Sequence, residues 1–321
     1  MNFIDLFCGI GGFRIAFEQA GANCVFSSDI DKYACETYNS NFSEFPLSDI
    51  TKIDERKIPN FDILCAGFPC QPFSIGGLRK GFAETRGTLF FDIERVLREK
   101  KPKSFILENV KGLINHEKGK TLETILNKLG DRVNYKYNEN KSPDCLNYDI
   151  HYKVINSKSF GVPQNRERVF IIGFLKHTDF HFPVSKKQKL LTDIIDYSLP
   201  TNTLSETLEN NIKIHLKNHK KYSEIKNLDY LLAYEVRKSR ATFRFDNLSP
   251  TLTAKMGTGG NNIPILVNLK RKLSTSECLS IQGFSKDFKI KPNYSQSYKQ
   301  IGNSVSVPVV ASLAKEMVKF I

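Results

Sequence analysis

The chain has 321 residues, which predicts about two domains or one large domain with an insertion, and its 40% hydrophobic and 25% charged residues are usual for a soluble globular protein. Lys and Arg outnumber Asp and Glu by 47 to 34, and the resulting formal net charge of +13 favours a polyanionic partner, nucleic acid first. Apolar runs such as FDILCAGF are strand-sized, well short of the ~18 residues of a membrane span, and the first residues lack the basic start of a signal peptide. We therefore expect a cytoplasmic protein without a membrane partner.

Cysteine and histidine are not spaced as metal ligands. The seven cysteines include no C-x-x-C pair, so neither a zinc ribbon nor a thioredoxin-type motif is predicted. Most of them fit small buried residues in a reducing compartment. His215 and His219 are four residues apart and could share a helix face, but no further ligand lies near them in the sequence. We expect no metal.

The first half of the chain alternates short apolar runs with amphipathic ones. Strands are expected at MNFIDLF (1–7), NCVFSSD (23–29), FDILCAGF (61–68), KSFILENV (103–110) and RVFIIGF (168–174). Helices are expected at GGFRIAFEQAG (11–21), KYACETYNSNF (32–42), GTLFFDIERVLREKK (87–101) and TLETILNKLG (121–130). Buried strands that alternate with helices predict a doubly wound, mostly parallel α/β sheet.

The composition changes near residue 176. From 176 to about 240 the chain is rich in Lys and Asn and weakly periodic, and from 241 to 267 it has the pattern of strands and turns around the cluster GTGGNN. Between 241 and 300, nine Lys and Arg stand against three Asp and Glu, a net charge of +6. These features predict a smaller, basic domain made mostly of strands and loops.

Two further segments complete this outline. A helical pattern returns in STSECLSIQGF (274–284), and the tail VSVPVVASLAKEMVKFI (305–321) is expected to form an apolar helix that packs back on the first domain. The stretch NENKSPDCLNYD (138–149) has the composition of a surface loop insertion.

A glycine-rich loop, DLFCGIGGF (5–13), connects the first expected strand with the first expected helix. Ligands bind at the carboxyl ends of strands in open α/β sheets, where glycines let the backbone approach them. Arg14 stands where a dinucleotide-binding fingerprint needs a third glycine, which weakens that interpretation. Asp29 and Asp49 each end a segment, and two acids at such ends suit the ribose and amine of a nucleoside cofactor such as S-adenosylmethionine. A tight turn with surface acids is the alternative.

Three short motifs follow, each at or beside a predicted strand: PCQ (69–71), ENV (108–110) and QNRER (164–168). Singly they are weak, because Cys70 could be a packing cysteine, ENV a strand exit and QNRER a solvated charge run. Together they supply a thiol, a carboxylic acid and two guanidinium groups. A thiolate is a strong nucleophile, a glutamic acid can protonate a ring nitrogen, and an arginine can hold a carbonyl oxygen. Cytosine presents such a nitrogen and carbonyl on one edge.

The order and spelling of these motifs resemble the DNA (cytosine-5)-methyltransferases of bacterial restriction–modification systems. The resemblance runs nearly from end to end of the chain, and it rests on DLFCGIGGF, DILCAGFPCQPFS, RGTLFF, ENVKGL, FGVPQNRERVFIIG, RKLSTSECLSIQGF and YKQIGNSV. It is weakest between about 176 and 270.

The resemblance implies a role for each matching residue. Cys70 matches the nucleophile, Glu108 the acid that contacts the base, and Arg166 and Arg168 the pocket arginines, with Arg168 on the base carbonyl. The residues that match the cofactor site are Phe7, Gly9, Gly11, Asp29, Ile30, Asp49, Ile50, Pro69, Leu89 and Asn303. Those that match DNA contacts are Gln71, Ser74, Arg86, Thr251 and Leu252, while Gln282 and Gly283 match the segment that organises the recognition domain.

The resemblance also implies a reaction and a domain organisation. A methyl group would pass from S-adenosylmethionine, leaving S-adenosylhomocysteine, to carbon 5 of a cytosine flipped out of a short double-stranded DNA sequence, through a cysteine adduct at carbon 6. Residues 1–182 and 303–321 would form the catalytic domain, 183–270 the recognition domain and 271–302 a hinge. We expect a monomer on the nucleoid, paired functionally with a restriction endonuclease.

Two departures and three rivals accompany this hypothesis. Ile30 stands where some family members carry a tryptophan against the adenine, and Gly76 and Gly77 predict a mobile catalytic loop. A nicotinamide-dependent dehydrogenase would share the glycine-rich loop but would not need the three later motifs together. A non-catalytic DNA-binding protein would be expected to lack Cys70 or Glu108. A tRNA-methylating branch would use the same chemistry but would read RNA shape, whereas the long basic region favours duplex DNA.

Overall fold

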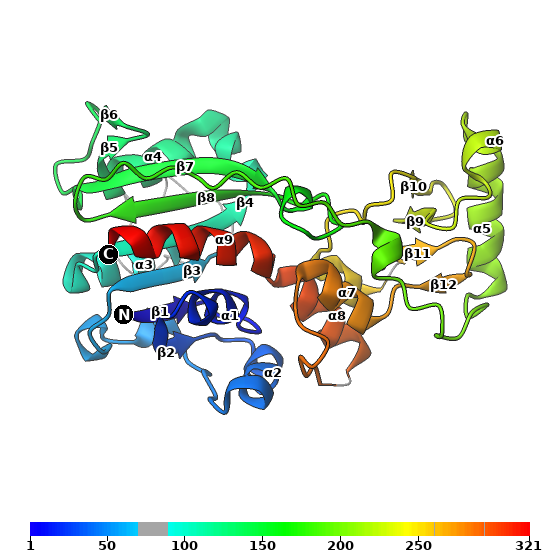
Figure 1. Cartoon of the computed structure of the whole chain (residues 1–321), viewed down its shortest axis with the longest axis horizontal. Coiled ribbons are helices and arrows are strands. Elements are labelled where there is room, and N and C mark those ends of the chain that lie inside the picture. Colours follow the sequence, from blue (N-terminus) through cyan, green and yellow to red (C-terminus); the bar gives the residue numbers. More distant parts are fainter. Residues whose placement is uncertain (70–88, 260, 292) are drawn as a thin grey trace, which may run out of the picture.

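The computed structural model describes residues 1–69, 89–259, 261–291 and 293–321. Figure 1 shows two lobes side by side, a larger one built on a long sheet and a smaller one built on short strands. Both chain termini lie on the larger lobe. No helix in the described ranges is long and apolar enough to cross a membrane.

The larger lobe contains an eight-stranded sheet with the order β2-β1-β3-β4-β8-β7-β5-β6. Its strands are β1 (Asn2–Leu6), β2 (Asn23–Ser28), β3 (Ile63–Gly67), β4 (Ser104–Val110), β5 (Gly130–Val133), β6 (Lys136–Tyr137), β7 (Tyr148–Asn156) and β8 (Glu167–Phe174). The pairings of β2, β1, β3 and β4 are parallel, as predicted. β8, however, runs antiparallel to both β4 and β7. A short connection without a crossover helix joins β7 to β8, and such a connection permits only antiparallel pairing.

Helices cover both faces of this sheet, so the lobe has three layers. Its helices are α1 (Gly12–Gln19), α2 (Lys32–Phe42), α3 (Leu89–Lys100), α4 (Lys120–Leu129) and α9 (Val307–Met317). Successive residues of β1 point to opposite faces: Phe3 packs with α1 and α9, whereas Ile4 packs with α3 and α4. The C-terminal helix therefore returns to the first domain, as the sequence predicts, and Figure 1 shows α9 along the sheet.

The segment predicted to be a loop insertion at 138–149 is only partly a loop. Its last two residues, Tyr148 and Asp149, begin β7 and are buried. Tyr148 stacks edge-on against Phe105 of β4, and its hydroxyl donates to the carbonyl of Pro102. Residues 138–147 are mostly polar, so the sequence pattern did not indicate that a strand begins at Tyr148.

The smaller lobe contains a four-stranded antiparallel sheet with the order β10-β9-β11-β12. Its strands are β9 (Leu232–Tyr234), β10 (Thr242–Arg244), β11 (Ile265–Leu266) and β12 (Arg271–Lys272), and its helices are α5 (Glu206–Lys217) and α6 (Tyr222–Ile225). The prediction of strands and loops missed α5. This helix presents only Leu208, Ile212 and Leu216, spaced by four, to the core, and this narrow stripe is hidden among Lys and Asn.

Two helices, α7 (Thr275–Gln282) and α8 (Tyr294–Asn303), lie between the two sheets (Figure 1). α8 packs against the 3₁₀ segment Ala254–Thr258 of the smaller lobe, and Gly302 allows the closest approach. A Cβ atom at Gly302 would lie 2.1 Å from the carbonyl carbon of Thr253. Only a glycine fits there without moving one backbone segment away from the other.

We expect Gly302→Ala to lower the free energy of unfolding by about 1–3 kcal/mol, because the added methyl group overpacks a contact between two backbones. Urea unfolding measures the change. Gly112→Ala is the matched control, because the nearest atom to its Cβ would be 3.9 Å away, in the side chain of Val110, which is an ordinary van der Waals distance. Equal unfolding midpoints for the two variants would contradict this account of Gly302.

Candidate active site

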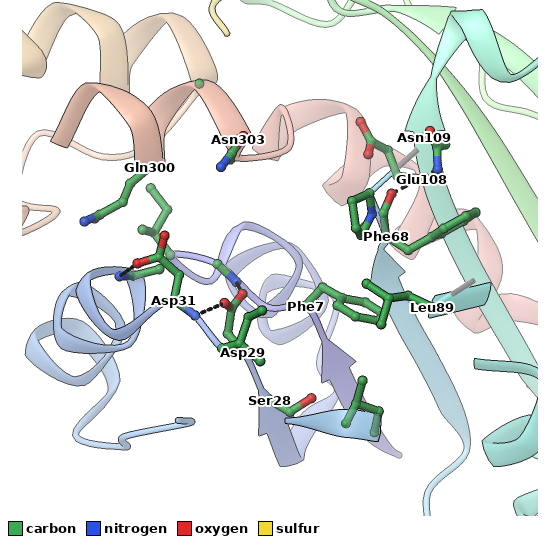
Figure 2. A pocket seen from close by; sticks show the side chains of 18 of the residues that line it. Phe7, Ser28, Asp29, Asp31, Phe68, Leu89, Glu108, Asn109, Gln300 and Asn303 are labelled. Atoms are coloured by element: carbon green, nitrogen blue, oxygen red, sulfur yellow. Dashed lines mark hydrogen bonds between the residues drawn. The ribbon is translucent and has the colours of Figure 1, made fainter. Parts of the chain in front are cut away.

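A cavity of about 350 Å³ opens at the carboxyl ends of β1, β2, β3 and β4. These strands are parallel neighbours, so the residues that follow them meet at one edge of the sheet. Figure 2 shows Phe7, Asp29 and Phe68 at this edge, facing Gln300 and Asn303 of α8. Residues far apart in the sequence thus form one site.

Most residues predicted for a cofactor line this cavity. They are Phe7, Gly9, Asp29, Ile30, Asp49, Ile50, Pro69, Leu89 and Asn303. Gly11 does not line it. It has a left-handed φ of 87° directly before α1, and a Cβ there would lie 2.3 Å from the ring of Phe42. Gly11 therefore shapes the turn that leads into α1.

Asp29 braces the glycine-rich loop from the end of β2. Its Oδ2 accepts a hydrogen bond from the Gly9 amide at 2.8 Å, and its Oδ1 accepts one from the Asp31 amide at 2.8 Å. Burial raises the pKa of Asp29 above its ordinary value. Phe7 holds a left-handed φ of 58°, which is strained for a residue with a side chain. The Asp29 carboxyl thus helps to hold Phe7 and Gly9 in place at the cavity wall.

Asp49 and Ile30 lie in a more open part of the cavity. Asp49 precedes the 3₁₀ turn Ile50–Lys52, and its Oδ1 accepts hydrogen bonds from the hydroxyl of Thr51 at 2.7 Å and its amide at 3.1 Å. The Thr51 hydroxyl, above all, lowers the pKa of Asp49, which keeps this carboxylate charged. Ile30 is 70% exposed and offers an apolar surface for a flat ring.

Contacts between α2 and α8 close the cavity on the other side. Lys299 Nζ lies 2.8 Å from Asp31 Oδ2, and the Thr37 hydroxyl donates to Gln300 Oε1 at 2.8 Å. The sequence prediction missed Asp31 and Gln300 as cavity residues. The signals were present, since Asp31 caps α2 and Gln300 lies in the YKQIGNSV motif.

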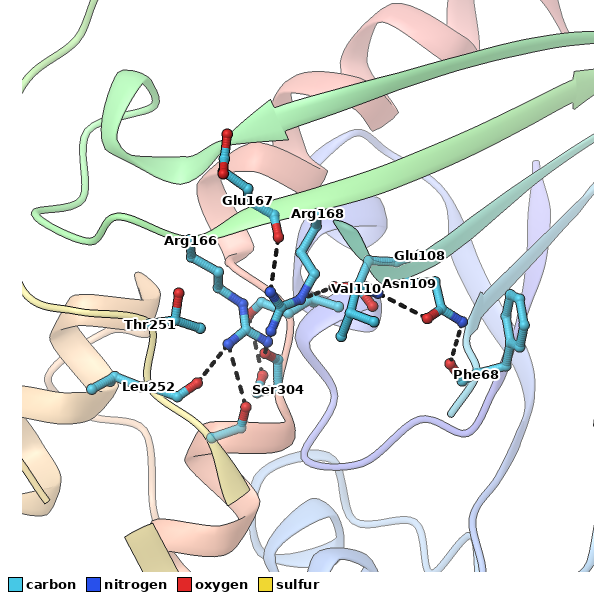
Figure 3. A network of polar contacts seen from close by, with 12 residues as sticks. Phe68, Glu108, Asn109, Val110, Arg166, Glu167, Arg168, Thr251, Leu252 and Ser304 are labelled. Carbon is cyan, nitrogen blue, oxygen red and sulfur yellow. Dashed lines mark hydrogen bonds and ion pairs between the residues drawn. The ribbon is translucent and has the colours of Figure 1, made fainter. Parts of the chain in front are cut away.

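The carboxyl group of Glu108 and the guanidinium of Arg168 face each other across β4 and β8. Arg168 Nε lies 3.0 Å from Glu108 Oε1. Yet Oε1 is buried and accepts no aligned hydrogen bond from any described residue. Both side chains line the cavity, and Figure 3 shows the polar network around them. An acid and a cation are thereby placed together beside the predicted cofactor site.

Arg166 differs from Arg168, although both were predicted to serve the same pocket. It is 3% exposed, and its terminal nitrogens donate to the carbonyls of Leu252 at 2.7 Å, Ser304 at 2.7 Å and Gly302 at 3.4 Å (Figure 3). Burial and the nearby Arg168 cation lower the pKa of Arg166 to about 9, so it remains protonated at neutral pH. Although Arg166 also borders the cavity, its bonds join the two lobes.

Gln164 and Gln282 extend this junction through their buried amides. Gln164 Nε2 donates to Gln282 Oε1 at 2.9 Å, and Gln164 Oε1 accepts from the amide of Leu252 at 2.9 Å. Gln282 Nε2 donates in turn to the carbonyl of Ile301 at 2.8 Å. Because both amides have directional bonds at each end, they fix the relative position of three chain segments.

The two DNA contacts predicted in the smaller lobe lie on the same junction. The hydroxyl of Thr251 donates to the carbonyl of Asn165 at 2.8 Å, and Thr251 is partly exposed. The side chain of Leu252 is fully buried, and Gln164 and Arg166 bind its backbone. Leu252 therefore positions the segment, and its side chain offers no surface to DNA.

The first 319 residues match the model of the C-5 cytosine-specific DNA methylases. The type II methyltransferase M.SsoII of Shigella sonnei is 42% identical, over 99% of this chain and 80% of its own length. M.HhaI of Haemophilus parahaemolyticus is 40% identical, over 98% of this chain and 93% of its own length.

The chain belongs to the C-5 cytosine-specific DNA methylase family.

Solved structures agree with the fold of this methylase. A putative DNA modification methyltransferase from an E. coli prophage superposes with a TM-score of 0.70 at 23% identity, covering 100% of this chain and 99% of the other. A DNMT2 variant of Spodoptera frugiperda does so with a TM-score of 0.70 at 19% identity, covering 99% of each chain. The resemblance read from the motifs is thus confirmed, and the methylase is an enzyme of the type II restriction–modification kind.

Several predicted residues of the methylase lie outside the described residues: Cys70, Gln71, Ser74, Gly76, Gly77 and Arg86. The segment that leads to Cys70 is described as far as Pro69, which lines the cavity. Asn109, which was not predicted as a site residue, donates to the carbonyl of Phe68 at 2.9 Å and thereby ties this segment to the end of β4. In the sequence, the only indication of a role for Asn109 was its position in the ENV motif.

Proposed function

We propose that this methylase transfers a methyl group from S-adenosylmethionine to carbon 5 of a cytosine flipped out of duplex DNA. The observation that carries the proposal is that a single cavity is lined both by Asp29 and Asp49 and by the Glu108–Arg168 pair. The first two suit a nucleoside, and the second two suit the polar edge of a cytosine. A methyl donor and its acceptor can therefore meet within one cavity.

The cavity fits S-adenosylmethionine in its chemistry. Carboxylates at Asp29 and Asp49 can accept from ribose hydroxyls and from an exocyclic amine, while Phe7, Ile30 and Ile50 provide apolar surface for the adenine. When bound, this cofactor supplies a methyl group on a sulfonium and departs as S-adenosylhomocysteine. No metal ion is proposed.

The protein's own groups would activate the base. The Cys70 thiolate forms a bond to carbon 6, Glu108 gives a proton to ring nitrogen 3, and the electron pair moves to carbon 5, which takes the methyl group. Loss of the carbon 5 proton to water then expels the thiolate, and the proton on nitrogen 3 returns to Glu108. Arg168 holds the carbonyl oxygen throughout. In the sequence Cys70 follows directly on Pro69, and Pro69 lines the cavity.

The smaller lobe is proposed to bind and read the DNA. We assign residues 1–182 and 303–321 to catalysis, 183–270 to target recognition and 271–302 to a hinge, because α7 and α8 lie between the two sheets. The excess of 47 Lys and Arg over 34 Asp and Glu supports a phosphate backbone as the partner. We further propose that the methylase acts as a monomer in the cytoplasm, on the nucleoid, beside a restriction endonuclease that it does not stably bind.

Bisulfite sequencing of plasmid DNA from cells that express the chain tests this function, with Cys70→Ala as the matched variant. We expect cytosines protected in one recurring sequence context with the wild type, and no protection with Cys70→Ala, because the variant has no thiolate to add to carbon 6. Protection that persists in the variant would contradict the covalent mechanism. If folded wild-type protein protects no context, the DNA substrate is wrong and tRNA is the next substrate to test.

A further inference from the structure

The arginines of the smaller lobe differ in whether a carboxylate neutralises them. Three of the four arginines between 183 and 302 are neutralised by a carboxylate: Arg240 by Glu235 at 3.2 Å, Arg244 by Asp246 at 2.6 Å and Arg271 by Glu277 at 2.8 Å. The fourth, Arg237, has no Asp or Glu within ion-pair distance among the described residues. Its charge remains available to a ligand.

Arg237 is nevertheless held in a defined place. Its Nη2 donates to Oδ1 of Asn262 at 2.9 Å. The orientation of the Asn262 amide is fixed, because its Nδ2 donates to the carbonyls of Gly259 at 2.7 Å and Lys255 at 3.0 Å. The backbone of Arg237 closes a turn with Arg240, with 2.7 Å between N and O. The Asn262 amide thus joins the turn between β9 and β10 to the backbone at Lys255 and Gly259.

This pair of loops lies beside the catalytic lobe. Asn262 and Lys255 line a second cavity, of about 290 Å³, together with Thr251 and Asn165. Asn165 precedes Arg166, whose bonds join the two lobes, and it accepts the hydrogen bond of Thr251. Asn262, which holds Arg237, therefore lines a cavity that also includes a residue of the catalytic lobe.

We propose that Arg237 reads a guanine of the target sequence through the major groove, with Asn262 as the residue that positions it. This proposal rests on the proposed function, since it presumes a duplex DNA substrate. A guanidinium has five N–H donors, and the structure uses two of those of Arg237, one on Asn262 and one on its own Val236 carbonyl. The free donors match the O6 and N7 acceptors of guanine, which arginine binds in a bidentate manner. A guanidinium that is held in place but not neutralised by a carboxylate is suited to binding guanine.

The test is methylation of a pool of duplexes with randomised flanks around a cytosine, read by bisulfite sequencing. Arg237→Lys keeps the positive charge but loses the paired N–H donors of the guanidinium. We therefore expect the preference for guanine at one position of the target to fall roughly 10- to 100-fold, while the base preferences at the other positions stay unchanged. Asn262→Ala should relax the same position to a smaller extent. Arg240→Ala is the control on the same turn, and its sequence profile should equal that of the wild type because Glu235 neutralises this arginine.

The outcomes separate this assignment from the proposed function. An unchanged profile for both Arg237→Lys and Arg237→Ala overturns the reading of guanine. A uniform loss across all sequences with Arg237→Ala, and none with Arg237→Lys, also overturns it and indicates a phosphate contact. Thermal unfolding and S-adenosylhomocysteine binding check that the variants fold, and Asn262→Ala tests the same position if they do not. If the wild-type protein methylates no duplex, the proposed function itself is wrong.

Discussion

Glu108→Gln is expected to reduce methyl transfer at least about 100-fold, because an amide keeps the shape of the side chain but cannot give up a proton. The position is suited to this role. Glu108 is buried, and its Oε1 lies 3.0 Å from Arg168 Nε but accepts no aligned hydrogen bond from any described residue, so the described residues leave this acceptor unused. Single-turnover methylation of duplex DNA measures the loss in the chemical step.

The control for this prediction is cofactor binding. Glutamine keeps the size and shape of the side chain, so we expect the variant to bind S-adenosylhomocysteine and to unfold as the wild type does. Arg168→Lys tests the other partner, and it should also lower the rate, because an ammonium cannot replace the planar guanidinium. A Glu108→Gln variant that methylates within a few-fold of the wild-type rate would remove Glu108 from the proposed mechanism.

Arg166→Met is expected to destabilise the protein by about 3–5 kcal/mol, the usual effect of breaking a buried polar network by removing one partner. The carbonyls of Leu252, Gly302 and Ser304 would lose their buried donor. Methionine fills similar space without supplying an N–H. Urea unfolding followed by circular dichroism measures the loss, and activity should fall together with stability.

The matched control is Arg56→Met, since the Arg56 side chain is 73% exposed and, within the described part of the chain, forms an ion pair only with Asp54. Its effect should stay below about 1 kcal/mol. If Arg166→Met unfolds at the same urea concentration as the wild type but has lost its activity, then Arg166 serves the substrate and not the junction between the lobes.

The sequence predicted the parallel half of the sheet well because each of its strands is a buried apolar run followed by a helix. It did not give the direction of β8, since the residues 168–174 are equally apolar in either orientation, and the short connection from β7 decided the pairing. It also missed α5, whose three core contacts leave most of the helix polar. Periodicity finds elements with wide apolar faces and overlooks those with narrow ones.

The candidate site shows the same division. The sequence motifs predicted that Asp29, Glu108 and Arg168 belong to one site, and all three line the same cavity. The motifs grouped Arg166 with them because both arginines share the QNRER motif. Only the three-dimensional arrangement shows that one guanidinium points to Glu108 and the other to the backbone carbonyls of Leu252 and Ser304. A sequence pattern names the charged groups, whereas burial and partners decide what each of them does.

The junction between the lobes has a consequence for how such an enzyme can change its target. In the catalytic lobe, the Arg166 guanidinium donates to the carbonyl of Leu252, and Gln164 Oε1 accepts from the Leu252 amide. The amide of Asn165 donates to the carbonyl of Ser249. These bonds depend on the path of the backbone and not on which side chains the recognition loops carry. The docking of the smaller lobe is therefore independent of what its loops read, and new loops can be inherited or exchanged while the catalytic machinery stays as it is.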